Sequence, residues 1–432
     1  MKGESERVQF AHHYPVAVFG GGVSGRAAAR LARSLGAEVQ VYDQRKGSVF
    51  GREEVERTGL VVTSPGFHRD HPWIVLARKA GCMIMGELDF ASLFWFGRII
   101  AVTGSNGKTT VTEFLTKVLR ESNLDAVAAG NIGYPLSTAA LEHDSIDAVA
   151  VCEVSSFQAE SLELLRPASV LWTSFSEDHL DRHANMQEYF KAKARLTDLA
   201  ASDSVFLGAG VSEAGRSLGV PFPKRTYHVS ENQVSDCVIP KDSPFNLGPQ
   251  KGNYALVRAY CRSLGIEDEA VERAASGFHL PGHRLSQPWK VGDVSFWNDS
   301  KATNFGATVA ACRHFAEKTF WIGGGQSKGG DLSCFCKRMK QLVRKAYLIG
   351  SNAQNMKNMF SKWGTPATVF ATLNDAVKQA FHEAKGKTNV LFSPGFASFD
   401  QFRGFEDRGK CFEQAVLDLK NSFEATTRPL IA

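Results

Sequence analysis

The chain is organised around Ile99-Ile-Ala-Val-Thr-Gly-Ser-Asn-Gly-Lys-Thr-Thr110. The apolar run at residues 99–102 predicts a buried strand, residues 104–109 a glycine-rich loop, and residues 111–119 an amphipathic helix. A loop in this position suits phosphate. Glycines let backbone N–H groups turn toward an anion, and the helix that follows adds the positive end of its dipole.

Two side chains in this loop carry the predicted chemistry. Lys108 would supply a charge for the β- and γ-phosphates of a nucleotide, and Thr109 a hydroxyl ligand for Mg²⁺. The usual phosphate-loop spacing asks for a glycine at position 102, where this chain has Val102. A glycine-rich turn with a surface lysine is therefore the alternative interpretation.

Length and composition narrow the class of protein. A chain of 432 residues is too long for one core and predicts several domains, while 43% hydrophobic and 22% charged residues are ordinary for a globular protein. The net charge of +5 is small, and no basic tract indicates a nucleic-acid partner. The eight cysteines lack metal-finger or CxxC spacing, which favours reduced thiols in a cytoplasm. The first fifteen residues do not resemble a signal peptide, and we expect no membrane span.

A second glycine-rich turn follows the first predicted strand. Gly20, Gly22 and Gly25 have GxGxxG spacing, and Asp43 ends the next strand, where an acidic residue would hold a ribose hydroxyl. Only about fifty residues separate Asp43 from the phosphate loop, too few for the second half of a dinucleotide domain. We therefore expect one nucleotide diphosphate rather than NAD or FAD, with a plain βα turn as the alternative.

The central part of the chain carries isolated polar residues at the ends of predicted strands. Glu153 ends an otherwise apolar strand at 147–154, and a carboxylate there is costly unless it is paired or binds a cation. His179 lies in a polar run after the strand at 169–175 and could bind a metal or be an ordinary surface histidine. Lys191 and Lys193 lie on a predicted helix at 186–199, and spacing alone suggests that both are solvated.

The C-terminal part, after a break at Pro281-Gly282, predicts a second doubly wound α/β unit. Polar loops follow three of its predicted strands, at residues 298–304, 323–330 and 393–402. Each could be a solvated turn. Three such loops at one sheet edge favour a binding face, because open α/β sheets bind ligands at the carboxyl ends of their strands.

Taken together, the motifs at 103–110, 130–133, 153–158 and 177–183 resemble those of the ATP-dependent Mur ligases. The loops at 298–304 and 393–402, with Phe405 and Arg408-Gly409, resemble those of the D-glutamate-adding members. The resemblance runs from Gly20 to Phe412. It implies a monomeric, cytoplasmic α/β ligase that adds D-glutamate to UDP-N-acetylmuramoyl-L-alanine through an acyl phosphate, during peptidoglycan precursor synthesis.

The resemblance also implies three domains: a UDP-substrate-binding half-Rossmann domain at 1–97, a central ATP-binding P-loop domain at 98–282, and an amino-acid-binding Rossmann-like domain at 283–432. Another Mur-type or folylpolyglutamate-type ligase is the alternative within the family. From the residues alone, a nicotinamide-dependent oxidoreductase and a nucleotide-binding protein without catalysis are further alternatives.

Site residues follow from the same resemblance. The UDP-substrate would contact Gly22, Val23, Ser24, Asp43, Arg45, Gly66 and Asn131. ATP would contact Gly104, Ser105, Asn106, Gly107, Lys108, Thr109 and Thr110, together with Arg284 and Asp299. D-Glutamate would contact Lys301, Thr303, Lys328, Ser398 and Phe405.

Two Mg²⁺ ions are implied. One would be bound by Thr109 and phosphate oxygens, and the other by Glu153, His179 and Lys193. The match to the family's Tyr189-x-x-x-Lys193 spacing implies that Lys193, rather than Lys191, carries CO₂ as a carbamate. With Lys108, the ligands of the second ion form the implied catalytic set.

Overall fold

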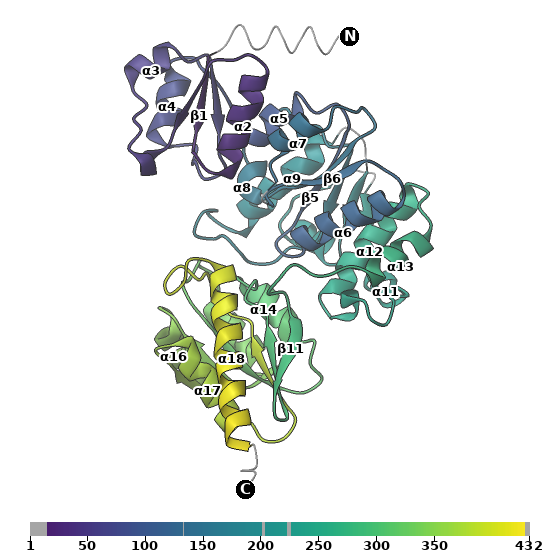
Figure 1. The fold of residues 1–432 in the computed structure, drawn as a ribbon, viewed down its shortest axis with the longest axis vertical. Coiled ribbons are helices and arrows are strands. Elements are labelled where there is room, and N and C mark those ends of the chain that lie inside the picture. The colour runs from purple at the N-terminus through teal and green to yellow at the C-terminus, as the bar shows by residue number, and fades with distance from the viewer. Residues whose placement is uncertain (1–14, 133, 201–203, 223–225, 428–432) are drawn as a thin grey trace. The chain divides into compact units, whose positions relative to one another are not determined.

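The computed structural model describes residues 15–132, 134–200, 204–222 and 226–427 (Figure 1). The residues before 15, interpreted above as unlike a signal peptide, and Gly133 of the 130–133 loop lie outside this description. The described chain alternates strands and helices and forms three separate sheets that are parallel except at one edge strand. This is the α/β class that the alternating sequence pattern predicts.

The first sheet has four parallel strands in the order β2-β1-β3-β4. The strands are β1 Val16–Phe19, β2 Val39–Tyr42, β3 Leu60–Thr63 and β4 Met83–Gly86. Its helices are α2 Val23–Ser34, α3 Arg52–Glu56, α4 Pro72–Lys79, α5 Glu87–Ser92 and the 3₁₀ turn η1 Gln44–Lys46. Helices α3 and α4 cover one face and α2 and α5 the other (Figure 1). Four strands make only a partial dinucleotide fold, as the short N-terminal segment predicts.

The second sheet has six parallel strands in the order β10-β9-β8-β5-β7-β6. The strands are β5 Arg98–Thr103, β6 Ala126–Gly130, β7 Val149–Glu153, β8 Ser169–Trp172, β9 Val205–Leu207 and β10 Thr226–His228. The helices are α6 Lys108–Glu121, α7 Leu136–Glu142, α8 Ser156–Ala159, α9 Met186–Leu199, α10 Val211–Ser217, α11 Glu231–Ser235, α12 Gln250–Ser263 and α13 Asp268–Ser276, with the 3₁₀ turn η2 Pro244–Asn246. Strand β5 lies between β7 and β8 and, after its first residue, is fully buried, as its apolar run predicts.

The third sheet has the order β11-β12-β16-β13-β14-β15, with only β11 antiparallel to its neighbour. The strands are β11 Ser286–Val291, β12 Val294–Asn298, β13 Thr319–Gly324, β14 Val343–Ile349, β15 Ala367–Val369 and β16 Thr388–Phe392. The helices are α14 Phe305–Cys312, α15 Leu332–Met339, α16 Ala353–Lys362, α17 Leu373–Glu383 and α18 Phe405–Thr427. Helices α14, α15 and α16 pack on one face, and α17 and α18 on the other.

The chain divides into two compact units. One unit contains the first two sheets and comprises the residues up to Phe175 with Gln187–Val238 and Gly252–Gly277. One apolar cluster spans both of its sheets, because α2 and α5 of the first sheet pack against α7 of the second, and a smaller cluster fills the other face of the first sheet. The other unit contains the third sheet and comprises Ser176–Met186, Ile239–Lys251 and the residues from Phe278 onward. The polar segment 176–186 therefore packs with the third sheet, although it follows a strand of the second.

Candidate active site

The glycine-rich loop between β5 and α6 has the backbone geometry of an anion cradle. Gly104 and Gly107 have φ values of 145° and 86°. A Cβ at Gly104 would lie 2.0 Å from Thr173 Oγ1, and a Cβ at Gly107 would lie 2.3 Å from Asn253 Oδ1, so both positions require glycine. Val102, the departure from the usual spacing, lies inside β5, where it pairs with two neighbouring strands and needs no glycine.

Two lysines donate to one carbonyl oxygen in this loop. Lys108 Nζ lies 2.8 Å from Gly104 O and 3.0 Å from Ser105 O, and Lys193 Nζ lies 2.9 Å from the same Gly104 O. Helix α6 begins at Lys108 and directs its first N–H groups toward the loop. The ammonium of Lys108 and the helix N-terminus therefore place positive charge at the loop, which suits a polyphosphate, and the Nζ of Lys193 lies beside them.

The two lysines of α9 have different environments. Lys193 is 1% exposed, and its Nζ lies 4.9 Å from the centroid of the Tyr189 ring. The Tyr189 hydroxyl is 3.1 Å from Ser105 Oγ, which connects α9 to the phosphate loop. Lys191 is exposed and forms an ion pair with Glu188. Burial next to the loop favours Lys193 over Lys191 as the functional lysine.

Glu153, at the end of β7, is a buried acid with unused hydrogen-bonding capacity. It is 2% exposed, and its Oε1 accepts a hydrogen bond of 2.9 Å from Asn131 Nδ2. Within the described part of the chain, Oε2 is buried and has no donor. A buried carboxylate oxygen without a donor is costly unless a cation is bound, and oxygen ligands are those that Mg²⁺ prefers. Thr109, the predicted ligand of the other ion, is partly exposed in the first turn of α6. These residues fit a hard divalent cation.

His179, the third predicted protein ligand of the second ion, belongs to the other unit. Its backbone has a φ of 55°, and its Nε2 lies 3.6 Å from a carboxylate oxygen of Asp178. Glu153 and Lys193 belong to the unit of the first two sheets, so the predicted ligand set is divided between the units. In the part of the chain that the structure describes, no three His, Cys, Asp or Glu side chains gather closely enough to bind a metal.

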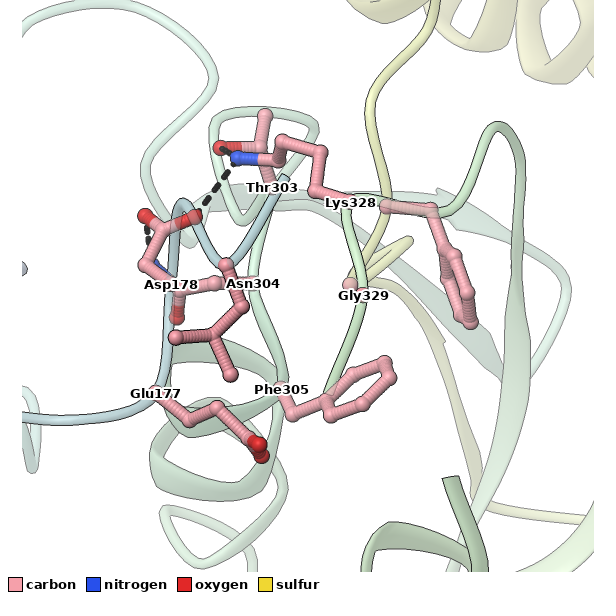
Figure 2. A pocket seen from close by; sticks show the side chains of 10 residues that line it. Glu177, Asp178, Thr303, Asn304, Phe305, Lys328 and Gly329 are labelled. Atoms are coloured by element: carbon pink, nitrogen blue, oxygen red, sulfur yellow. Dashed lines mark hydrogen bonds and ion pairs between the residues drawn. The ribbon is translucent and has the colours of Figure 1, made fainter. Parts of the chain in front are cut away.

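A small pocket lies at the carboxyl edge of the third sheet, where Lys328 and Asp178 form an ion pair (Figure 2). Lys328 Nζ is 2.8 Å from Asp178 Oδ1 and 3.5 Å from Thr303 Oγ1. The other Asp178 oxygen accepts from Asn304 Nδ2 at 3.0 Å. The cavity measures about 20 Å³ and is also lined by Glu177, Leu180, Phe305, Gly329, Gly395 and Phe396. Burial alone would raise the pKa of Asp178, but the charges of Lys328 and His179 hold it below the ordinary value.

Of the five predicted D-glutamate residues, Thr303 and Lys328 line this pocket, and the other three lie outside its lining. The loop of Lys328 pairs with the loop of Ser398 through two backbone hydrogen bonds between Gln326 and Ala397. Lys301 Nζ lies 3.6 Å from the centroid of the Phe405 ring. All five predicted residues therefore lie on loops that follow β12, β13 and β16, or at the start of α18. The loops therefore share one edge of the third sheet, and their role in binding stays a prediction.

Arg408, in the first turns of α18, connects these loops. It is 1% exposed and donates to Ser300 Oγ, to Ser300 O and to Phe396 O at distances of 2.9 to 3.1 Å. Burial lowers its pKa to about 10, so the guanidinium stays charged at neutral pH. Neither Arg408 nor Asp178 is in the set of site residues inferred from the sequence. The only sequence signal for Arg408 is its place in the Arg408-Gly409 motif.

Arg284 and Asp299 are the two residues of the C-terminal part that are predicted to contact ATP. Asp299 accepts hydrogen bonds from Leu285 N at 3.1 Å and Ser393 Oγ at 2.7 Å, and burial raises its pKa to about 7. Arg284 stands between His283 and Leu285, which both have left-handed backbones with φ of 62° and 47°. Such strain persists only where surrounding contacts maintain it, and Asp299 supplies one of them.

The predicted UDP-binding residues, except Asn131, lie at the carboxyl edge of the first sheet. Gly22 is the N-cap of α2, and Val23 and Ser24 form its first turn. Asp43 accepts hydrogen bonds from Gly21 N and Arg45 N, both at 3.0 Å, and these bonds, that of Gly21 first, lower its pKa. Gly66 is exposed, as is Arg45. Asn131 lies beside Glu153 instead. Asp43 thus shapes the glycine turn, and the N-terminus of α2 remains open for an anion.

The chain is similar to known proteins over most of its length. A family model, "Mur ligase middle domain", matches residues 102–218, and another, "Alanine dehydrogenase/PNT, C-terminal domain", matches residues 6–63. Two relatives, from Caldanaerobacter subterraneus subsp. tengcongensis and Gloeobacter violaceus, are each named UDP-N-acetylmuramoylalanine–D-glutamate ligase. They are 33% and 34% identical over 94% of this chain, which covers 98% and 99% of them. The MurF ligase of Thermotoga maritima in complex with ADP has a similar fold, with a TM-score of 0.57, 14% identity and coverage of 87% of this chain and 91% of that one.

Proposed function

The chain belongs to the UDP-N-acetylmuramoylalanine–D-glutamate ligases of the Mur ligase family, and from this membership we propose a role for each part of the molecule. The enzyme is an ATP-dependent ligase of peptidoglycan precursor synthesis that forms an amide bond between UDP-N-acetylmuramoyl-L-alanine and D-glutamate. We place the reaction in the cytoplasm, where the nucleotide substrates are made. Among the described residues, no helix has the length and apolar character that crossing a bilayer requires.

We assign one substrate to each of three domains, with boundaries at residues 1–97, 98–282 and 283–432. The first sheet would bind the UDP moiety, with the pyrophosphate at the N-terminus of α2 on Gly22, Val23 and Ser24. The exposed guanidinium of Arg45 would add a charge near the nucleotide. Four strands suit a single nucleotide, which argues against a nicotinamide-dependent oxidoreductase despite the match to a dehydrogenase family over residues 6–63.

ATP would bind at the loop between β5 and α6. The loop's backbone N–H groups and Lys108 would hold the phosphates, with Lys108 exchanging its bonds to two carbonyl oxygens for bonds to phosphate oxygens. An oxygen of the alanyl carboxylate then attacks the γ-phosphorus, and the bond from that phosphorus to the β,γ-bridging oxygen breaks. The products are an acyl phosphate and ADP. Both reactants are anions, so the protein contributes chiefly by positioning them and neutralising their charge.

Magnesium would be bound by Thr109 with phosphate oxygens, and by Glu153, His179 and Lys193 at a second position. When bound, it would reduce the repulsion between carboxylate and phosphate.

We propose that Lys193 reacts as a neutral amine with CO₂ and loses a proton, giving a carbamate that supplies oxygen ligands. The burial of Lys193 supports this proposal, because desolvation favours the neutral amine. Lys193→Ala should be inactive and partly restored by short carboxylates, and full activity without any additive would contradict this role.

D-Glutamate would bind at the pocket in Figure 2. A cavity of about 20 Å³ holds little more than one water, so the ion pair between Lys328 and Asp178 must open to admit the amino acid. Lys328 and Thr303 would then take one carboxylate, Ser398 and the backbone at Phe405 the other, and Asp178 would accept from the amino group. The amine nitrogen attacks the acyl carbon, a tetrahedral intermediate forms, and phosphate leaves.

The 33–34% identity over 94% of the chain is the observation that carries this function. The test is ADP release with UDP-N-acetylmuramoyl-L-alanine in parallel reactions with D-glutamate, L-glutamate and meso-diaminopimelate. We expect stoichiometric ADP and amide product with D-glutamate only. Preferred use of meso-diaminopimelate or L-glutamate would instead favour another Mur-type or a folylpolyglutamate-type ligase.

A further inference from the structure

A second cavity, of about 190 Å³, lies at the amino-terminal edge of the second sheet. Arg98 and Val149 begin β5 and β7, Leu119 lies in the last turn of α6, and Leu264 directly follows α12, and all four line the cavity. The phosphate loop follows the opposite end of β5 and precedes the opposite end of α6. The cavity therefore lies at one end of β5 and α6, and the phosphate loop lies at the other end of both elements.

The walls of this cavity are mainly aliphatic, with polar groups among them. Ile100, Leu119 and Val149 are nearly fully buried and contribute apolar surface. Tyr260 is 3% exposed, and burial raises its pKa against a smaller opposing effect of Ser169, so the hydroxyl keeps its proton at neutral pH. These walls are complementary to a ligand that has an apolar body and a polar head.

Arg98 gives the cavity a preferred charge. Arg98 is exposed, and its guanidinium has no hydrogen bond or ion pair among the described residues; both Arg98 and Tyr260 line the cavity, and the charge of Arg98 acts on the Tyr260 hydroxyl. An unpaired guanidinium favours a carboxylate, which it can bind through two parallel hydrogen bonds. A strongly hydrated anion such as inorganic phosphate would leave the aliphatic walls without a partner.

We propose that this cavity is a binding site for a small monocarboxylate with an apolar body of about six carbons, remote from the ATP loop. The carboxylate lies against Arg98 and the Tyr260 hydroxyl, and the hydrocarbon fills the space between Ile100, Leu119 and Val149. The volume is sufficient, because a cavity of about 150 Å³ already accommodates benzene. Aliphatic and aromatic acids share this chemistry, and the experiment distinguishes them. The inference does not rest on the proposed function.

The test measures binding of hexanoate and of benzoate to the full-length protein by calorimetry, with 1-hexanol and benzyl alcohol as uncharged counterparts. Ligands with eight or nine heavy atoms should bind with a dissociation constant of about 1 mM. We expect one of the acids to bind at least tenfold more tightly than its alcohol. The better acid identifies the ligand as aliphatic or aromatic. Absence of measurable binding, or equal binding of acid and alcohol, would overturn the proposal.

Substitutions in the cavity test whether the acid binds there. Arg98→Gln should abolish the preference for the acid, whereas Arg166→Gln should not, because Arg166 does not line the cavity and its guanidinium already donates to two carbonyl oxygens. Leu264→Trp should weaken binding at least tenfold by filling the cavity, and Leu264 is 38% exposed, so the larger side chain is tolerated. If it does not fold, Ala168→Leu serves the same purpose. Displacement of the acid by ADP would place it at the phosphate loop and contradict the proposal.

Discussion

Glu153 shows how one buried atom can indicate a ligand. One carboxylate oxygen has an amide donor from Asn131, while the other is buried with no donor among the described residues. A purely structural acid would have both oxygens satisfied, as Asp89 does by accepting three backbone N–H bonds from residues 163–165. The contrast between these two buried acids supports a cation at Glu153.

Glu153→Gln should lower kcat by about a hundredfold or more, because the amide is a weak ligand for Mg²⁺. The free energy of unfolding should stay the same or rise by up to about 1–3 kcal/mol, since an unsatisfied buried charge is removed. Turnover at several Mg²⁺ concentrations and urea unfolding measure the two effects. Glu121→Gln, on the surface of α6, is the control and should change neither. If the Glu153→Gln variant turned over as fast as wild type, Glu153 would be excluded as a ligand.

Asp178 could not be found from the sequence. The run 177–183 contains two aspartates and two histidines, and nothing in its pattern distinguishes Asp178 from Asp181. Only the packing of segment 176–186 against the third sheet places Asp178 opposite Lys328. The resemblance to the family identified Lys328 as a site residue. Only the structure shows that Lys328 forms an ion pair with Asp178.

Asp178→Asn should raise the KM for D-glutamate and lower the free energy of unfolding by about 1–3 kcal/mol, because Lys328 loses its buried partner. The pKa of Asp178 is lowered in the folded protein, so its stabilisation is present above the ordinary aspartate pKa and disappears as the pH falls through the folded-state value. The stability difference between wild type and variant should therefore be largest at neutral pH and shrink in acid. A constant difference from pH 7 to pH 3 would contradict this assignment.

At the scale of elements, the sequence pattern predicts long elements well and their ends less well. The predicted helix at 186–199 matches α9 at both ends, whereas the strand predicted at 169–175 begins with β8 at Ser169 but β8 already ends at Trp172. Helix α6 begins at Lys108 rather than at 111, because the start depends on the turn at Gly107 and not on apolar periodicity. Residues 211–252 carry no motif, yet they contain α10, β10 and α11. Short, half-exposed elements leave little hydrophobic pattern to detect.

Glu87 connects two helices of the first unit, and its burial could not be predicted. It starts α5, is 3% exposed, and accepts a 2.7 Å hydrogen bond from Ser137 N in the first turn of α7. Burial raises its pKa in the folded state, and the bond from Ser137 only partly opposes this effect. A raised acid pKa means that stability from this group is greatest at low pH and declines as pH rises through the folded-state value.

Glu87→Gln keeps the acceptor for Ser137 N and cannot ionise. The variant should therefore be more stable than wild type at pH 8, and the two should converge toward pH 5. Urea unfolding at both pH values measures the difference. A stability difference between variant and wild type that does not change with pH would mean that the pKa of Glu87 is the same in the folded and unfolded states.

For the whole molecule, the proposed binding sites are divided by unit. The predicted UDP residues and the phosphate loop lie in one unit, and all predicted D-glutamate residues lie in the other. Each unit has its own core, so damage to one site should leave binding at the other intact. The binding events should therefore be separable by mutation.

Lys328→Ala should raise the KM for D-glutamate by at least about tenfold while calorimetric affinity for a non-hydrolysable ATP analogue stays unchanged. Lys108→Ala should show the reverse: loss of nucleotide affinity and near-total loss of ligation, in a protein that unfolds like wild type. Weakened nucleotide binding in the Lys328→Ala variant would indicate that its effect spreads through the fold.

We propose that the alanyl carboxylate attacks the γ-phosphorus of ATP before any amide bond forms. The most direct test uses UDP-N-acetylmuramoyl-L-alanine labelled with ¹⁸O in that carboxylate and follows the label by mass spectrometry. The acyl phosphate route predicts that each released phosphate carries one ¹⁸O from the carboxylate. Unlabelled phosphate, formed together with the amide product, would contradict the acyl phosphate route.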